Sequence, residues 1–172
     1  MTAEMAPLVF VMAEMIRPQP GYRLIFVYDL LMDEVEVRRH CAAQFVSTAR
    51  VLKRQFVVNS EGAVTSVRRD GYAIHGIVWQ ASEAEALQLE DFLGVPRKVD
   101  RFGAFARTQR DGLVAVEFYG ARNHRHGEAN HGDIEKLLAL VKQREFPDSY
   151  RREIASWAPG PVELDDRPRL VP

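Results

Sequence analysis

A short apolar run that leads almost directly into a helix start is the feature that most limits how this chain can fold. Residues 24–27 (LIFV) indicate a buried strand, and residues 33–40 (DEVEVRRH) begin with acids and end with bases, as helices commonly do. Only residues 28–32 (YDLLM) connect the two. Strand, turn and helix therefore form one tight corner.

Other segments of the chain read as strands. Residues 45–58 and 72–80 are rich in β-branched and aromatic side chains, and residues 100–109 and 113–119 predict a hairpin that turns at Gly112. These strands lie between helical patterns rather than alternating strictly with them. The mixture predicts an α+β domain.

Local signals also mark the helices. Ser82 and Glu85 match a capping box, in which each side chain satisfies a free amide at the start of a helix. We expect this helix to begin at Ser82 and to end before Gly94. Two further helices are predicted over residues 133–144 and 148–157.

Length and charge narrow the class of protein. The chain has 172 residues, enough for one domain with its own core, and 23 basic against 24 acidic side chains give a net charge of −1. Because no overall field favours nucleic acid or an anionic membrane, neither is expected as a partner. A solvated sheet face is predicted for the basic cluster, which consists of Arg50, Lys53, Arg54, Arg68 and Arg69.

Two features indicate a cytoplasmic location. Cys41 is the single cysteine, so the chain cannot form an internal disulfide, and that suits a reducing compartment. The apolar stretch at residues 8–12 lacks a basic leader and is interrupted by Glu14 before it reaches the length of a signal peptide or a membrane span.

Five short segments follow one another in the order found in one known family. They are residues 28–32 (YDLLM), 49–56 (ARVLKRQF), 75–79 (HGIVW), 89–95 (LEDFLGV) and 146–150 (FPDSY). Through them, residues 24–159 resemble the γ-glutamyl cyclotransferase-like (AIG2-like) family. The resemblance implies that the α+β domain is a small mixed β-barrel flanked by helices, with a pocket at one mouth.

The resemblance also implies a reaction. Family members let the α-amine of a γ-glutamyl substrate attack its own γ-carbonyl, which releases an amine and 5-oxoproline. Because the attack is intramolecular, the protein mainly has to fold the substrate, accept a proton and stabilise an oxyanion. In the family, backbone N–H groups of the turn after the first strand bind the substrate and one glutamate acts as base and acid. No cofactor is implied.

This chain departs from the family pattern at both of those places. The family turn reads Tyr-Gly-Ser-Asn-Leu or Tyr-Gly-Thr-Leu, whereas Asp29 and Leu30 follow the tyrosine here. The family helix ends Leu-Asp-x-x-Glu-Gly, and its glutamate falls on Leu93, which cannot transfer a proton. Asp29 would repel a substrate carboxylate if it faced the pocket; alternatively, Asp29 or Asp33 caps the following helix. The substrate-binding residues that the resemblance implies are Tyr28, Asp29, Leu30, Leu31, Met32 and Leu93.

Two other acids could replace the missing glutamate. Glu90 lies three residues before Leu93 and therefore shares its helix face, while Asp91 should point elsewhere. Glu90 is the better catalytic candidate of the two. The alternative is that both are ordinary exposed helix carboxylates.

A histidine-containing loop is a weak candidate for a metal site. His124 and His126 face the same way on an extended segment, and His131 or Glu128 could complete a set of ligands. Because no standard motif has this spacing, we interpret the segment as a hydrated loop and expect no bound metal.

The chain ends lie outside the resemblance. We divide the chain into an N-terminal arm at residues 1–21, a domain at residues 22–158 and a proline-containing tail at residues 159–172. Prolines and a glycine close the arm, which could pack on the domain, on a second copy of the chain or on a protein partner.

The sequence leads to one preferred function and one alternative. The preferred interpretation is a diverged γ-glutamyl cyclotransferase-like protein that binds a small metabolite, such as one with a γ-glutamyl-like group, or a protein partner without the usual chemistry. The alternative is an active cyclotransferase or related amide-processing enzyme that uses Glu90 or Asp91.

Overall fold

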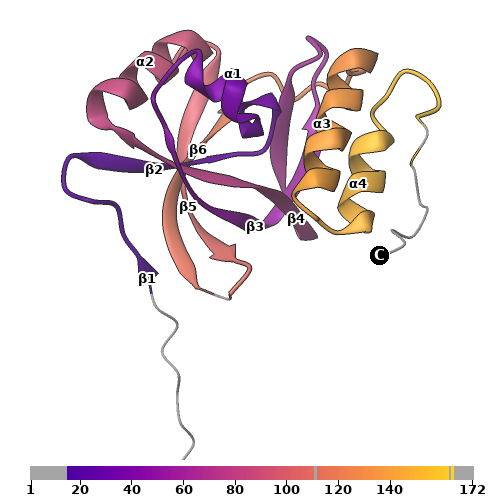
Figure 1. Cartoon of the computed structure of the whole chain (residues 1–172). Coiled ribbons are helices and arrows are strands. Elements are labelled where there is room, and N and C mark those ends of the chain that lie inside the picture. Colours follow the sequence, from indigo (N-terminus) through magenta and orange to yellow (C-terminus); the bar gives the residue numbers. More distant parts are fainter. Residues whose placement is uncertain (1–14, 111, 163, 165–172) are drawn as a thin grey trace, which may run out of the picture.

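The computed structural model describes residues 15–110, 112–162 and 164. These residues form one body of strands and helices (Figure 1). In chain order the elements are β1 (Met15–Ile16), β2 (Tyr22–Val27), the 3-10 turn η1 (Leu30–Met32), α1 (Glu34–Arg38), β3 (Gln44–Val58), β4 (Val64–Ser82), α2 (Glu83–Leu93), β5 (Val99–Thr108), β6 (Leu113–Ala121), α3 (His131–Gln143) and α4 (Asp148–Ala155).

Five strands close into a barrel. The hydrogen-bonded order is β6-β2-β4-β3-β5, and β5 pairs with β6 again to complete the ring. All of these pairs are antiparallel except β2 with β6, which is parallel, so the barrel is mixed. Closure leaves no long open edge among these strands. The predicted small mixed barrel flanked by helices is confirmed.

The long β3–β4 ribbon contains an irregularity that changes which side chains face inward. The register shifts between Leu52 and Arg54, and the extra residue, Lys53, has a φ of 59°. An inserted residue reverses the alternation of side chains on a strand. As a result Arg54 lies over the rings of Phe102 and Phe118, at 5.7 and 5.1 Å from their centroids.

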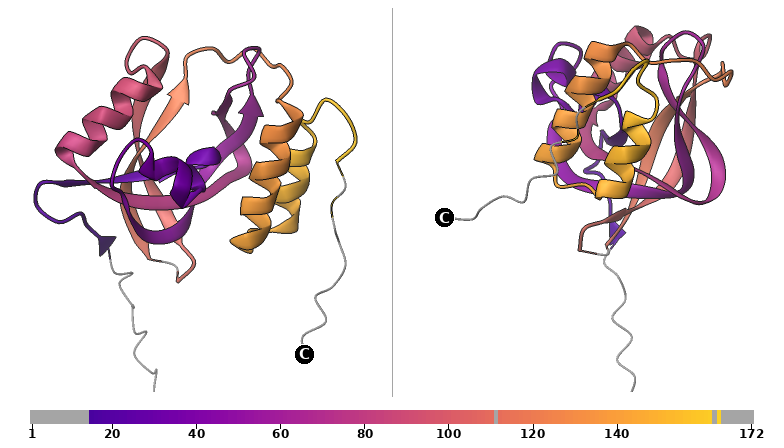
Figure 2. Two further views of the ribbon diagram at one scale, coloured as in Figure 1. Left: turned by 45° about the horizontal axis from the view of Figure 1, so that its top comes forward. Right: turned by 90° about the vertical axis from the view of Figure 1, so that its right-hand side faces the viewer.

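The helices cover the barrel in two groups. Helices α3 and α4 pack side by side against one flank, and α1 and α2 lie over another part of the barrel (Figures 1 and 2). The buried side chains of α3 recur at helical spacing: they are Ile134, Leu137, Leu138 and Val141. Helix α3 begins two residues earlier than the sequence predicts, because the Asn130 side chain caps it by accepting from the Asp133 amide.

The capping box and the hairpin follow the sequence closely. The Ser82 hydroxyl accepts from the Glu85 amide, the Glu85 carboxylate accepts from the Ser82 amide, and Gly94 ends α2 with a φ of 82°. Strands β5 and β6 form the predicted hairpin. Strand β4 is longer than predicted: it begins at Val64, and residues 64–68 pair with β3.

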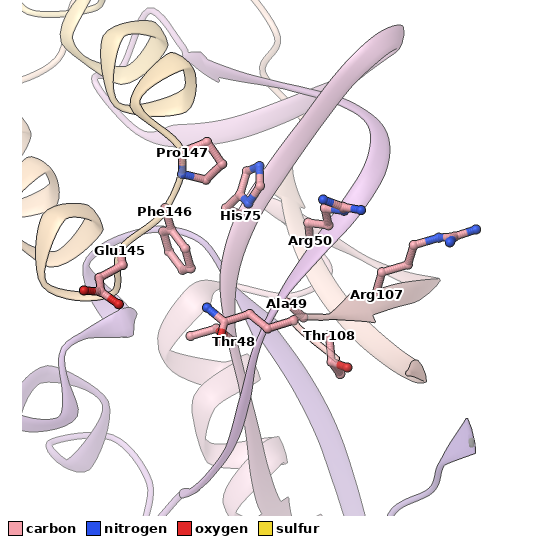
Figure 3. Close-up of a pocket in the computed structure, with 10 residues that line it drawn as sticks. Thr48, Ala49, Arg50, His75, Arg107, Thr108, Glu145, Phe146 and Pro147 are labelled. Atoms are coloured by element: carbon pink, nitrogen blue, oxygen red, sulfur yellow. The ribbon is translucent and has the colours of Figure 1, made fainter. Parts of the chain in front are cut away.

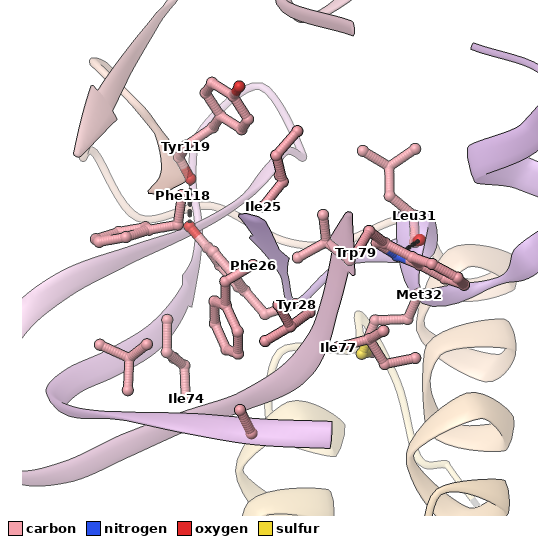
Figure 4. Packing of buried hydrophobic residues seen from close by; sticks show 14 of the residues in the cluster. Ile25, Phe26, Tyr28, Leu31, Met32, Ile74, Ile77, Trp79, Phe118 and Tyr119 are labelled. Carbon is pink, nitrogen blue, oxygen red and sulfur yellow. Dashed lines mark hydrogen bonds between the residues drawn. The ribbon is translucent and has the colours of Figure 1, made fainter. Parts of the chain in front are cut away.

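The core fills the barrel and the space under the helices. Figure 4 shows Phe26, Tyr28 and Phe118 packed together, with Trp79 beside Leu31 and Met32. The indole Nε1 of Trp79 donates to the Leu31 carbonyl at 3.0 Å. Burying each large apolar side chain contributes roughly 1.5–3 kcal/mol, so this cluster fixes the corner after β2.

The predicted division into arm, domain and tail is not tested by the structure. In the described part of the arm, Met15 and Ile16 pair in parallel with Leu113 and Val114 of β6, which adds a short strand to the sheet. Residues 1–14 and 165–172 of the predicted arm and tail lie outside the described residues. None of the described helices is both long enough and apolar enough to cross a membrane.

Candidate functional site

The corner after β2 is a capped 3-10 turn. The Asp29 carboxylate accepts from the Leu31 amide at 2.9 Å, and the Asp33 carboxylate accepts from the Val35 amide at 2.9 Å to start α1. Both aspartates are therefore N-caps, as one of the two interpretations of Asp29 expects. Asp29 is directed at its own turn.

Three backbone donors of this turn are used within the chain. Besides the Leu31 amide, which Asp29 accepts, the Met32 amide donates to the Asp29 carbonyl and the Asp33 amide donates to the Leu30 carbonyl, each at 3.0 Å. A ligand could take these amides only by displacing bonds that hold the turn together. Burial raises the pKa of Asp29, and the hydrogen bond from the Leu31 amide opposes that shift.

The side chains of the corner are structural. Tyr28 is only 4% exposed, and its hydroxyl donates to the Tyr119 carbonyl at 2.8 Å (Figure 4). Burial raises the pKa of Tyr28 to about 12, so the phenol stays protonated. Leu31 and Met32 are buried in the core, and Leu30 is partly buried against it. Tyr28, Leu31 and Met32 therefore belong to the core, and Leu30 packs against it.

The end of α2 presents an apolar residue, Leu93, at the position where the sequence resemblance places the family's glutamate. Leu93 is partly buried and packs against the core. The neighbouring Asp91 is exposed, and Phe92 stacks on His40 with ring centroids 3.6 Å apart. Only Glu90 among the acids predicted for this helix end is buried, at 9% exposure.

Glu90 belongs to a buried ionic cluster. Its Oε1 accepts from Arg23 Nη2 at 2.5 Å, from the Tyr119 hydroxyl at 3.0 Å and from Arg101 Nη1 at 3.2 Å. Arg23, which is 8% exposed, also donates from Nε to Glu117 Oε2 at 2.6 Å. Its Nη1 lies 3.7 Å from the exposed Glu83 carboxylate. We call these six residues the Arg23 cluster.

The pKa of Glu90 follows from this setting. Burial raises it, but the hydrogen bonds from Arg23 and Tyr119 and the charge of Arg101 outweigh burial, so the pKa lies below its usual range. For Arg23 the balance has the opposite signs. Burial lowers its pKa, but the hydrogen bonds to Glu90 and Glu117 outweigh burial, so the pKa of Arg23 lies above its usual value. Arg23 and Glu90 are therefore an ionised pair at neutral pH.

Sequence reasoning missed most of this cluster. It found Glu90 but not Arg23, Glu117 or Tyr119. One signal was available: Glu117 and Tyr119 are two apart in a predicted strand and so share a face, and Arg23 is the single charge beside the apolar run of β2. The spacing of these residues does not indicate that Arg23 and Tyr119 contact Glu90 of α2.

The histidines of the loop before α3 do not converge. The His126 ring meets Trp157 edge-on, at 5.1 Å between centroids, and His131 lies 3.3 Å from Glu135 on the next turn of its own helix. Among the residues that the structure describes, no group of three or more His, Cys, Asp or Glu side chains could hold a metal ion.

A groove of about 250 Å³ lies on the barrel away from the corner (Figure 3). It lies where β3 meets β4 and β5, beneath the loop between α3 and α4. Of the predicted basic cluster, only Arg50 takes part in it. The lining residues are Thr48, Ala49, Arg50, His75, Arg107, Thr108, Gln109, Glu145, Phe146 and Pro147.

The fold of this chain matches solved structures of known proteins. No protein-family model and no curated protein matches the sequence. Among solved structures, a γ-glutamyl cyclotransferase superposes with a TM-score of 0.73 at 17% identity, over 82% of this chain and 90% of its own. The human protein loc79017 has a TM-score of 0.74 at 17% identity, covering 84% and 92%. A mouse AIG2-like protein has a TM-score of 0.52 at 18% identity, covering 65% and 93%.

These matches agree with the resemblance that the sequence predicts. The chain has the γ-glutamyl cyclotransferase-like fold, along most of its length and most of the length of the structures it matches. At these identities the likeness concerns the fold, and the chemistry has to be argued from the residues of this chain.

Proposed function

We propose that this protein keeps the γ-glutamyl cyclotransferase-like fold but not the cyclotransferase reaction, and that it binds a small metabolite or a protein partner. The observation that carries the proposal is the end of α2. The position of the family's glutamate is Leu93, and the one buried acid nearby, Glu90, is paired with Arg23.

The state of Glu90 argues against a transferred catalytic role. A general base works best when its pKa lies near the operating pH, which enzymes achieve by raising a glutamate's pKa. The pKa of Glu90 is shifted the other way by its cationic partners. Taking a proton would also disrupt its pairing with Arg23.

The corner after β2 supports the same proposal. Family members offer backbone N–H groups to the substrate at this turn, whereas here the amides of Leu31, Met32 and Asp33 are bonded within the chain. The Asp29 carboxylate also takes the place that a substrate anion would have at this turn, since it accepts a hydrogen bond from the Leu31 amide.

The second candidate function is an active amide-processing enzyme that uses Glu90. The contact between the Tyr119 hydroxyl and Glu90 Oε1 favours it, because a buried carboxylate beside a phenol is a common proton-transfer pair. The exposed Asp91 has no comparable neighbour in the part of the chain that the structure describes.

Release of 5-oxoproline from γ-glutamyl dipeptides and γ-glutamyl amines tests the proposal. We expect the wild-type protein to match a blank without protein. Turnover by the wild type that disappears in Glu90→Gln would contradict the proposal and establish the second candidate.

Gain-of-function variants provide a second test of the same proposal. Leu93→Glu restores a proton-transfer group at the family position, and general acid–base catalysis is worth roughly 10²–10⁴-fold in rate. We expect partial activity from it, and more when Asp29→Gly and Leu30→Ser open the turn. Leu93→Gln, similar in size but unable to act as a base, is the control. If the folded triple variant stays as inactive as Leu93→Gln, either the alignment of residues 89–94 with the family's catalytic helix is wrong or the pocket no longer accepts a γ-glutamyl group.

A further inference from the structure

Three basic side chains stand in a row on the barrel surface. Arg50 of β3 is the direct cross-strand partner of His75 on β4 and of Arg107 on β5. Direct partners project to the same face of a sheet, so the three side chains line one strip of the groove (Figure 3). Like charges placed directly opposite each other are destabilising, and the pairing of Arg50 with Arg107 is such a case.

The charge of this strip is not neutralised by the described part of the chain. There, neither Arg50 nor Arg107 is within ion-pair distance of a carboxylate. Glu145, the one acid that lines the groove, lies at its other end, beyond Phe146 from the two guanidinium groups (Figure 3). Arg50 and Arg107 are exposed. The more buried arginines discussed above have partners within the chain: Arg23 has carboxylates, and Arg54 has the Ser66 oxygens and two rings.

The remaining walls suit a small polar ligand. Thr48 lies two residues before Arg50 on β3, so its side chain projects to the same face of the sheet and lines the groove. The His75 ring is held against Phe146 and Tyr150, with centroids 5.6 and 4.8 Å away. Burial and the charge of Arg50 lower the pKa of His75 to about 4, so the neutral ring adds a hydrogen-bond donor without a third charge.

We propose that this groove is a binding site for a small metabolite bearing an oxyanion, either a phosphate or a carboxylate group. The oxyanion lies between Arg50 and Arg107, where it offsets their repulsion and accepts charge-assisted hydrogen bonds. Thr48 and His75 provide further donors. A volume of about 250 Å³ is below that of most pockets for drug-sized ligands, so the ligand is small.

The site is separate from the corner after β2 and from the Arg23 cluster. Its residues come from the middle of β3 and β4, the end of β5 and the loop between α3 and α4. The inference is therefore independent of whether the chain retains cyclotransferase activity, and the two can fail separately.

Titration of the full chain with inorganic phosphate and with acetate, followed by amide chemical shifts at constant ionic strength, tests the proposal. We expect saturable shifts at Arg50, His75 and Arg107 with at least one of the two anions. Binding of phosphate alone identifies a phosphate ligand, and binding of acetate identifies a carboxylate ligand. Absence of saturable shifts with either anion would overturn the proposal.

Matched variants show whether the arginines hold the anion. Arg50→Gln and Arg107→Gln should each weaken binding at least about tenfold, since each removes a charged hydrogen-bond donor. Arg97→Gln, which changes an exposed arginine of the loop after α2, should leave binding unchanged. Equal affinity in the wild type and in the Arg50→Gln, Arg107→Gln double variant would also overturn the site. Far-ultraviolet circular dichroism confirms that the variants are folded.

Discussion

Two regions of this barrel contain arginines close to other charged side chains, and they differ in whether a carboxylate neutralises the arginine charge. In the Arg23 cluster, a guanidinium that is 8% exposed is bonded to Glu90 and Glu117. In the groove, Arg50 and Arg107 face each other across β3 and β5 with no carboxylate in ion-pair distance among the described residues. The charge of the first region is paired within the chain, although Arg23 Nη1 is buried and makes no hydrogen bond to the described residues. In the second region, the proposed ligand supplies the negative charge.

This contrast separates structure from function. Buried charges are costly unless they are paired, so an internally paired cluster holds elements in place, here β2, β6 and α2. Exposed like charges that the fold places side by side do not hold the fold together. They therefore point to a ligand more directly than the buried acid does, although Glu90 is the residue that sequence reasoning favoured.

The largest expected effect comes from breaking the Arg23 cluster. Arg23→Met should lower the free energy of unfolding by roughly 3–5 kcal/mol, because it leaves Glu90 and Glu117 buried or half-buried without their cation. Urea denaturation measures it. Arg38→Met is the matched control: its exposed pair with Glu34, four residues earlier on α1, should cost only about 0.3–0.5 kcal/mol. Similar losses in both variants would show that the cluster is not a special element of stability.

A second substitution sharpens that result. Adding Glu90→Leu to Arg23→Met removes the stranded carboxylate, and replacing a buried ion pair with apolar side chains is often neutral or stabilising. We expect the double variant to recover most of the lost stability in the same urea melts. A double variant as unstable as the sum of its single variants would mean that Arg23 and Glu90 do not interact energetically.

The two regions should respond to acid in different pH windows. The folded pKa of His75, about 4, is below its ordinary value of about 6.5, so the unfolded state binds more protons between these values. Stability should therefore fall as the pH drops from about 6.5 to about 4. In His75→Gln that fall should be smaller, as melts at several pH values would measure.

Glu90 provides the contrasting window. Because its folded pKa is lowered, its contribution is fully present above the ordinary glutamate pKa of about 4.3 and is lost as the pH falls through the folded value. The difference in stability between wild type and Glu90→Gln should be constant above about pH 5 and shrink only below it. A difference that already shrinks near pH 6 would mean that Glu90 is not held ionised by its partners.

The smallest expected effect is a gain in stability at the groove. In low-salt buffer without phosphate, Arg107→Gln should raise the free energy of unfolding by roughly 0.2–1 kcal/mol, because it removes a like charge opposite Arg50. Added salt should reduce the gain through screening. Arg97→Gln should show no comparable gain. A loss of stability in Arg107→Gln would mean that the arginine packs favourably in the free protein and that the pair is not strained.

Several features of the fold could be read from the sequence because they are local. The capping box at Ser82 and Glu85, the glycine that ends α2 and the aspartate caps at Asp29 and Asp33 each depend on residues a few positions apart. The resemblance supplied the barrel, and the comparison with solved structures confirms that fold. Residues 64–71 were not predicted as part of a strand; residues 64–68 pair with β3, and this long-range pairing extends β4.

The candidate sites depended on contacts that no local pattern contains. Glu90 meets Arg23 from 67 positions away, and Tyr119 reaches Glu90 from 29 positions away. Arg50 meets Arg107 only because β3 pairs with β5 in one register as the barrel closes. The sequence by itself determined most of the strands and helices and several of their ends, since caps, turns and alternation act over a few residues. Only the tertiary structure decided which charges are paired and which are left open, because strand register and barrel closure bring distant side chains together.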